Sequence, residues 1–274
     1  ANPGAIRKIV KWLGRKDAPL LFRLRADPRQ WLWGIRFLFE CLPMRHRANV
    51  VQLVRLGLYS RATLQALRRE TGIAYHQLER GILHLYSEPR DFEAAARTAE
   101  LMRGLGVDRV PKSVEECIAI EPALATARAR IAGGTYAASD ESGDAHRFTQ
   151  ELARLCARRG VRFDFGRTVR SLIAWGDRVE GVETDGELVR ADAYVVALGS
   201  YSPLLLRPIG VSLPIYPAKG YSVTMPVKDS AAAWIVSLSD EAHKLVFARL
   251  GERLRIAGTA ELTGYDTSID EVRC

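Results

Sequence analysis

A segment near the middle of the chain carries the strongest chemical signal in the sequence. Residues 191–198 form the apolar run Ala-Asp-Ala-Tyr-Val-Val-Ala-Leu, and small residues follow it at 199–202. This pattern predicts a buried strand followed at once by the first turn of a helix. Gly199 removes side-chain bulk at the turn, and a helix N-terminus favours the negative charge of a phosphate. A dinucleotide could therefore lie against Ala197, Leu198, Gly199 and Ser200, although small residues also end ordinary buried strands.

The rest of the sequence argues against several kinds of site. No spacing typical of a Ser/His/Asp triad and no set of metal ligands is present. The four cysteines are far apart and form no CxxC pair, which argues against a zinc site or a disulfide framework and fits a reducing cytosol. No stretch approaches the ~18 apolar residues of a membrane-spanning helix, and no secretory signal is present.

Composition and charge indicate a folded chain with two unlike parts. The 274 residues are 47% apolar, enough for one large domain or two smaller ones. Residues 1–70 hold 15 basic and 4 acidic residues, a net charge of +11, whereas the remainder carries −3. The chain opens at Ala1 without a methionine and stops at Cys274 just after a predicted strand, so we expect it to be an internal fragment.

Hydrophobic periodicity predicts helices in the first part of the chain and mainly strands after Gly72. Helices are expected over 5–13, 28–42, 48–70, 92–105, 114–120 and 145–159. Strands are expected over 73–75, 81–86, 133–137, 161–165, 168–175, 178–184, 187–190, 191–198, 215–226, 233–236, 245–248 and 253–259. This order predicts a mixed α/β (α+β) fold, in which a partial Rossmann-like domain lies beside an antiparallel sheet with N-terminal helices.

The order of elements from Gly160 to Ser202 resembles the second half of the FAD-binding domain in the D-amino acid oxidase superfamily. Within it, the motifs ALGSYS (197–202), YPAKGYS (216–222) and RIAGTAE (255–261) most resemble the small subunit of bacterial D-amino acid dehydrogenase. The basic opening, with KIVKWL at 8–13 and APLLFRLRADPRQWLW at 18–33, is also similar to that subfamily. The resemblance runs along nearly the whole chain.

The resemblance implies an FAD-dependent enzyme that converts D-amino acids to 2-oxo acids and ammonium by hydride transfer to the flavin. Electrons would pass to a quinone-like respiratory acceptor rather than to oxygen. The backbone of Val169 would contact the adenine side of FAD, and the turn Ala197, Leu198, Gly199 and Ser200 would lie against the cofactor. The cofactor would supply the redox chemistry, and no residue is assigned as a catalytic base.

Three residues are candidates for contact with the substrate. Lys219 and Tyr221 lie where the chain crosses to the substrate sheet, although Lys219 could equally satisfy strand carbonyls. Tyr75 lies in a predicted strand beside His76, and a lone histidine is more often structural than catalytic. We interpret Asp144 as the cap of the following helix and Glu261 as a solvent or turn residue.

Two departures from the family pattern limit what this chain can do alone. No G-x-G-x-x-G follows a strand, although family members carry one near the N-terminus to hold the FAD pyrophosphate. The C-terminal section with the carboxylate-binding arginine is also missing, so we expect weak FAD binding. We divide the chain into a substrate or cap domain (1–130), the second half of the FAD-binding domain (131–213) and a return to the substrate sheet (214–274).

The basic, tryptophan-containing opening has two interpretations. Its helices could lie on an anionic bilayer, or they could pack on the substrate domain with the basic side in water. We expect a cytoplasmic protein with peripheral contact on the inner face of the cell membrane. We expect no nucleic-acid partner, because no known binding module accompanies the charge. A glycine or sarcosine oxidase and a non-catalytic membrane-binding module are the alternatives.

Overall fold

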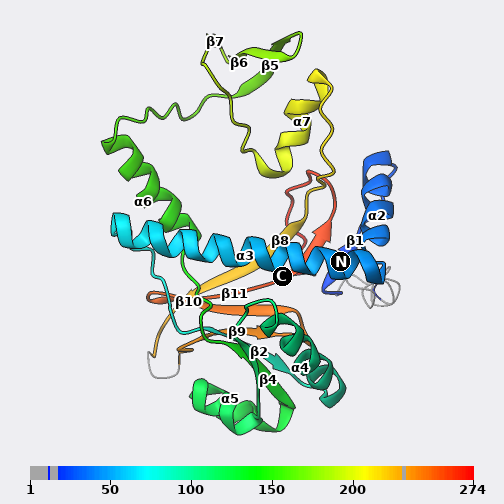
Figure 1. The fold of residues 1–274 in the computed structure, drawn as a ribbon, viewed down its shortest axis with the longest axis vertical. Helices are drawn as coiled ribbons and strands as arrows, with labels where there is room; N and C mark the ends of the chain where they lie inside the picture. Colours follow the sequence, from blue (N-terminus) through cyan, green and yellow to red (C-terminus); the bar gives the residue numbers. More distant parts are fainter. Residues whose placement is uncertain (1–11, 13–17, 230–232) are drawn as a thin grey trace.

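The computed structural model describes residues 12, 18–229 and 233–274, and a large mixed sheet organises most of them (Figure 1). Its strands follow the order β1-β11-β10-β9-β2-β4-β3, and β8 also pairs with β11. The pairs β1–β11 and β2–β9 are parallel, and the other pairs are antiparallel. The strands are β1 (Leu20–Phe22), β2 (Ile82–Tyr86), β3 (Arg109–Lys112), β4 (Gly133–Ala137), β8 (Lys219–Pro226), β9 (Ser237–Asp240), β10 (Leu245–Leu250) and β11 (Arg253–Leu262).

Local signals set the ends of the helices. Asp27 caps α2 by accepting from the backbone N–H of Arg29, and Gly72 ends α3 in the left-handed conformation. Ser113 and Glu116 form a capping box at the start of α5. The helices are α2 (Pro28–Glu40), α3 (Pro43–Thr71), α4 (Pro89–Arg103), α5 (Val114–Ile120), α6 (Ala145–Arg158) and α7 (Ser202–Leu206), with 3-10 turns η1 (Pro122–Arg130), η2 (Gly199–Tyr201) and η3 (Arg207–Ile209).

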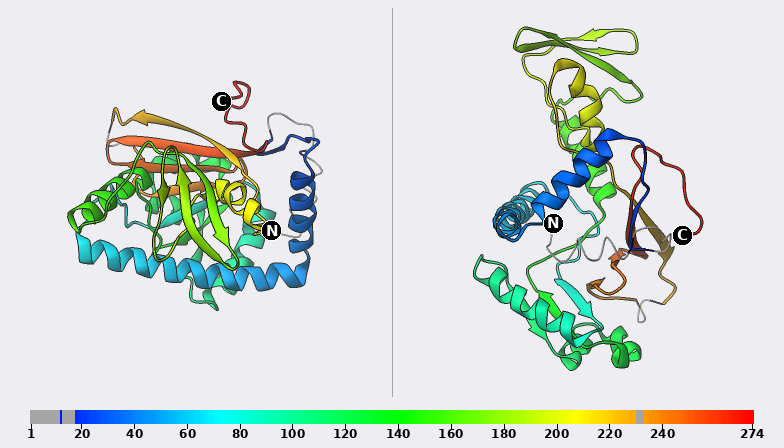
Figure 2. Two further views of the ribbon diagram at one scale, coloured as in Figure 1. Left: turned by 90° about the horizontal axis from the view of Figure 1, so that it is seen from above. Right: turned by 90° about the vertical axis from the view of Figure 1, so that its right-hand side faces the viewer.

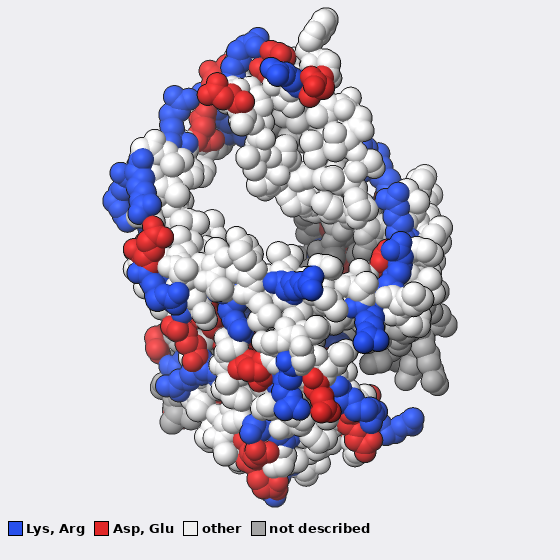
Figure 3. All heavy atoms as spheres, in the orientation of Figure 1, with Lys and Arg blue, Asp and Glu red and all other residues white. Residues whose placement is uncertain are grey.

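A second, antiparallel sheet lies apart from the large one. It consists of β5 (Val169–Trp175), β6 (Arg178–Thr184) and β7 (Leu188–Val189). It lies beyond α6 and α7, on the far side of α3 from the large sheet (Figures 1 and 2). Figure 3 shows an opening through the molecule between this small sheet and the α3 side.

The best-buried apolar cluster lies under the β2–β9 half of the large sheet. Leu83 of β2 and Leu238 of β9 meet Cys117 of α5, Leu124 of η1 and Val236 there. Leu83 and Cys117 are fully buried. Burial of these side chains attaches α5 and η1 to the sheet.

Many elements confirm the sequence predictions. The helix at 114–120 and the strands at 133–137 and 178–184 have the predicted bounds, and the other helices after residue 28 agree within a few residues. The mixed α and β fold class is confirmed as well. The helix predicted over 5–13 lies outside the described residues except for Trp12, which is helical.

Four predicted strands are wrong. Residues 73–75, 161–165, 191–198 and 233–236 lie in irregular segments. The segment 191–198 is the most consequential, because Val195 is 91% exposed instead of buried. Among the described residues, no strand pairs with this segment, and an apolar run becomes a buried strand only where neighbouring strands satisfy its backbone. The small sheet is therefore the antiparallel set β5-β6-β7, and the segment 191–198 does not join it.

Asp144 offers a test of how α6 is held. Its carboxylate accepts from the backbone N–H groups of His146 and Arg147, both at 3.1 Å, and forms an ion pair with Arg253 at 2.6 Å. These two backbone hydrogen bonds lower the pKa of Asp144, with Arg253 contributing. We expect Asp144→Ala to lower the free energy of unfolding by about 1–2 kcal/mol, measured by urea denaturation of the full-length protein. Asp144→Asn keeps a side-chain oxygen that can cap the helix, so its free energy of unfolding should fall less than that of Asp144→Ala. Equal decreases in the two variants would show that the cap is unimportant.

Candidate active site

The pairing of β8 with β11 brings the sequence-predicted Lys219 and Tyr221 together with a set of charged residues. Lys219 lies opposite Glu261, and Tyr221 lies opposite Gly258. The register shifts between Gly258 and Ala260, so Thr259 forms a bulge in β11. Two of the three candidate substrate residues, Lys219 and Tyr221, therefore lie at one end of the large sheet, beside a local irregularity.

Glu261 is the centre of a buried ionic cluster at this end of the sheet. Its side chain is 1% exposed and accepts a hydrogen bond from the Tyr221 hydroxyl at 2.8 Å. The Arg23 guanidinium also donates to it, the Lys219 Nζ lies 3.4 Å from its Oε2 atom, and the Arg273 Nε lies 3.9 Å away. We call these five residues (Arg23, Lys219, Tyr221, Glu261 and Arg273) the Glu261 cluster.

The charge state of Glu261 follows from these contacts. Burial by itself raises the pKa of a carboxyl group, but the hydrogen bonds from Tyr221 and Arg23 outweigh burial and lower the pKa of Glu261. Glu261 is therefore ionised at neutral pH. Our interpretation of Glu261 as a solvent or turn residue was wrong, because its cationic partners stabilise a buried carboxylate.

Lys219 and Tyr221 have structural contacts at this end of the sheet. The Lys219 ammonium donates to the Ser268 carbonyl at 2.7 Å, and it lies 5.8 Å from the centre of the Tyr221 ring. Arg273 lies over the same ring at 5.5 Å. Lys219 thus satisfies the carbonyl of a residue outside the strands rather than a strand carbonyl, and both Lys219 and Arg273 lie over the Tyr221 ring.

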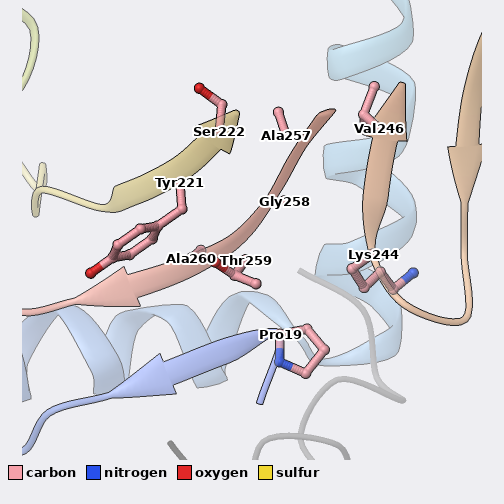
Figure 4. A pocket seen from close by; sticks show the side chains of 10 residues that line it. Pro19, Tyr221, Ser222, Lys244, Val246, Ala257, Gly258, Thr259 and Ala260 are labelled. Carbon is pink, nitrogen blue, oxygen red and sulfur yellow. The ribbon is translucent and has the colours of Figure 1, made fainter. Parts of the chain in front are cut away.

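Two cavities adjoin Tyr221. One, an open depression of about 510 Å³, lies over the adjacent strands β8, β11 and β10 and is lined by Tyr221, Gly258, Thr259, Lys244 and Pro19 among others (Figure 4). A second, of about 350 Å³, is lined by Tyr221, Leu245, Ile256 and Arg273 among others. Both cavities are large enough for a small organic molecule.

Thr259 is strained where it lines both cavities. Its φ angle is +56°, a conformation that a β-branched residue rarely adopts. Its hydroxyl is buried and finds no hydrogen-bond partner among the described residues. Backbone strain combined with an unpaired polar atom is typical of a functional position.

This strain predicts that a glycine would be tolerated better than threonine. We expect Thr259→Gly to raise the free energy of unfolding of the full-length protein by about 1 kcal/mol. Ala257→Gly, in the same strand at an ordinary φ, should lower it by about 1 kcal/mol. Denaturant titrations of both variants would check this, and a loss of stability in Thr259→Gly would show that the side chain has a structural contact.

The sequence-predicted cofactor residues lie on β5 and on the turn that leads into α7. Val169 begins β5 and is 39% exposed, and Ala197 to Ser200 form the turn into η2. The Tyr265 hydroxyl donates to the Ser200 carbonyl at 2.7 Å, and the rings of Tyr201 and Tyr265 lie 5.2 Å apart. Because Tyr265 follows β11, these contacts connect the turn to the end of the large sheet that holds the Glu261 cluster.

The turn leaves enough space for a cofactor to contact the protein backbone directly. Gly199 has a φ of +54°, and a Cβ atom placed on it would meet no atom within 4 Å. No backbone group of residues 192–197 pairs with another described residue. These features fit one side of a dinucleotide site. The phosphate-binding G-x-G-x-x-G is absent from the sequence, so the residues present account for only part of an FAD site.

Tyr75 lies far from Lys219 and Tyr221. It is 4% exposed, its hydroxyl accepts from Arg68 at 2.9 Å, and its carbonyl accepts from the backbone of Asp144. Asp144 pairs with Arg253 at the start of β11, whereas Glu261 lies near the end of that strand. Eight residues of strand span roughly 26 Å, so the structure does not bring Tyr75 to the Glu261 cluster. Its role in substrate contact stays a prediction.

Other kinds of site find no support in the described part of the chain. The His76 Nε2 atom accepts a hydrogen bond from the Arg147 guanidinium at 2.8 Å, and His76 lies near Tyr75 rather than the cavities. No group of three metal-ligating side chains occurs among residues 18–229 and 233–274. None of the described helices is both long enough and apolar enough to span a bilayer.

Comparisons of sequence place the chain among flavoproteins. A family model described as FAD dependent oxidoreductase matches residues 20–274. D-amino acid dehydrogenase of Dechloromonas aromatica (strain RCB) is 54% identical over all of this chain and 67% of its own length. The protein of the same name from Paramagnetospirillum magneticum is 54% identical over all of this chain and 65% of its own length. The chain thus spans about two thirds of these curated relatives.

Solved structures agree on the fold. Glycine oxidase from Geobacillus kaustophilus matches with a TM-score of 0.70 and 26% identity, over 80% of this chain and 59% of that one. L-proline dehydrogenase from P. horikoshii matches with a TM-score of 0.69 at 18% identity, over 78% of this chain and 57% of that one, which shows the shared fold alone.

Proposed function

This chain belongs to the family of FAD dependent oxidoreductases, and we propose that the whole protein oxidatively deaminates D-amino acids to 2-oxo acids and ammonium. The observation that supports this most strongly is 54% identity over the full chain to relatives named D-amino acid dehydrogenase. The glycine oxidase likeness is 26% in sequence, so a glycine-type or sarcosine-type oxidase is the second candidate.

Val169 and the turn from Ala197 to Ser200 would hold part of the cofactor. Their backbone is accessible, and Gly199 leaves open space where a side chain would otherwise stand. FAD, when bound, accepts the hydride that leaves the substrate α-carbon. The protein's own groups orient the substrate and keep water away from the reacting atoms.

We place the substrate beside Tyr221 and Thr259. The Tyr221 hydroxyl is already held by Glu261, so Tyr221 would shape the wall of the cavity. The Lys219 ammonium is held by the Ser268 carbonyl outside that wall and would contribute its positive charge nearby. Thr259 lines the same cavity as Tyr221, and its buried hydroxyl has no partner among the described residues, so a rotation of the side chain would present a donor to a ligand there. Pre-positioned groups of this kind lower the entropic cost of reaching the reactive geometry.

The domain division at residues 130 and 213 is retained as a proposal, with β4 of the middle segment contributing to the substrate-domain sheet. We further propose that electrons leave through a quinone-like respiratory acceptor and that the protein is cytoplasmic, touching the inner face of the membrane. The excess of basic residues in 1–70 supports that contact.

A substrate comparison on the full-length protein tests the proposal. We expect turnover of D-alanine with a quinone acceptor, and little turnover of glycine or sarcosine under the same conditions. Faster oxidation of glycine or sarcosine with oxygen as the acceptor would favour the second candidate. A purified full-length protein without flavin absorbance would overturn both, leaving a non-catalytic membrane-binding module.

A further inference from the structure

Helix α2 presents an apolar face that stays about half exposed among the described residues. Trp31, Leu32, Ile35, Leu38 and Phe39 lie on one side of the helix, and each is between 44% and 64% exposed. The opposite side holds Gln30, which is 2% exposed and bonds the Arg23 and Leu262 carbonyls. We call these five apolar side chains the α2 face. A cluster of large exposed apolar groups is unusual on a soluble surface and is typical of a binding surface.

The α2 face continues into its surroundings. Leu42 and Met44, in the connection to α3 and its first turn, are 46% and 88% exposed. Between α2 and β1, an apolar cavity of about 250 Å³ is lined by Phe22, Leu24, Trp31, Ile35 and Leu38 among others. Because its lining is mostly apolar, this cavity suits an unbranched hydrocarbon chain.

Basic side chains border the α2 face. Arg36 lies one helical turn from both Leu32 and Phe39, and Arg29 lies one turn before Leu32. Both arginines are exposed and form no ion pair with a described residue, and the Arg45 guanidinium lies 4.7 Å over the Phe39 ring. Figure 3 shows basic side chains along the edge of the molecule where α2 lies. Residues 28–47 hold four arginines and one acidic residue, Glu40.

We propose that the α2 face docks on an anionic lipid bilayer, with α2 lying in the plane of the headgroups. The apolar side chains would enter the acyl boundary, and Arg29 and Arg36 would meet lipid phosphates. A second copy of the chain fits less well, because two-fold contact through this face would bring like charges together. This inference rests on the proposed function, which places the quinone-like electron acceptor in the membrane. The α2 face would be the surface that contacts that membrane.

Vesicle binding of the full-length, flavin-loaded protein tests the proposal. Sedimentation with phosphatidylcholine vesicles, with and without phosphatidylglycerol, measures the bound fraction. We expect binding that needs the anionic lipid and weakens with salt. Ile35→Glu combined with Phe39→Glu should reduce binding about tenfold or more, because two charges would enter the acyl boundary. Leu101→Glu, at a residue of α4 that is 48% exposed, should bind like the parent.

A second variant keeps the test independent of folding. Arg29→Gln with Arg36→Gln leaves the apolar residues in place and should reduce binding to the anionic vesicles alone. D-alanine oxidation with a soluble dye acceptor should be unchanged in every variant, so loss of docking is separable from loss of the proposed activity. Equal binding to both vesicle types, no vesicle binding, or a parent dimer that Ile35→Glu dissociates would each overturn the proposal.

Discussion

Replacing Glu261 by glutamine is expected to lower the free energy of unfolding of the full-length protein by about 3 kcal/mol at neutral pH. The amide keeps the size of the side chain and can still accept from Tyr221. It removes the negative charge that Lys219 and Arg273 approach, and the Arg273 side chain is itself 1% exposed. Removing one partner of a buried ion pair costs more than the intact pair contributes to stability.

The same cluster predicts a pH dependence with a definite sign. The pKa of Glu261 lies below its ordinary value of 4.5 in the folded protein, so the ionised form is favoured there. Its contribution to stability is then fully present above the unfolded pKa and is lost as the pH falls through the folded pKa. Urea titrations at several acidic pH values should show parent and Glu261→Gln converging as the pH decreases.

Glu187 provides a matched control for this experiment. It also pairs with an arginine, Arg167, but its side chain is 53% exposed. Glu187→Gln should therefore change the free energy of unfolding by less than about 1 kcal/mol. If Glu261→Gln changed the free energy of unfolding as little as Glu187→Gln, the cations of the Glu261 cluster would have to be as well solvated as those on the surface. The ion pairs of the cluster would then not stabilise the pairing of β8 with β11.

Elements with local signals could be predicted from the sequence. The capping box at Ser113 and the break before Pro122 fix α5 within a few residues, so nothing distant is needed to set its ends. The alternating run at 82–86 likewise predicts β2. The run at 191–198 has an equally strong apolar pattern, yet a strand also requires partners for its backbone, and a local pattern cannot report whether they are present.

The candidate site could be predicted only in part for a related reason. Lys219 and Tyr221 lie two residues apart on one strand, so a single motif contains both. Glu261 and Arg23 are separated by 238 positions, and only the parallel pairing of β1 with β11 brings them together. The one available signal for Glu261 was a charged residue inside the apolar run 256–262, which suggests burial but not which cations would compensate it. The strain at Thr259 depends on the bulge, which the sequence does not reveal.

Replacing Leu83 by alanine is expected to lower the free energy of unfolding by about 3 kcal/mol. Leu83 is fully buried and packs in the cluster with Cys117, Leu124, Val236 and Leu238. β2 is hydrogen-bonded on both sides, to β4 and β9, so the backbone around the site cannot move far to fill the space. Most of the cavity should persist, and its lost contacts add to the lost transfer free energy.

Leu101→Ala is the control for this second prediction, because Leu101 is also a leucine but is 48% exposed on α4. Its cost should stay within about 0.5 kcal/mol in urea titrations of the full-length protein. The Leu83 cluster lies under β2 and β9, whereas Tyr221 and Thr259 lie on β8 and β11. Leu83→Ala should therefore unfold at lower denaturant yet keep the turnover number of the folded enzyme. A parallel fall in turnover would show that the core around β2 also sets the geometry of the cavities beside Tyr221.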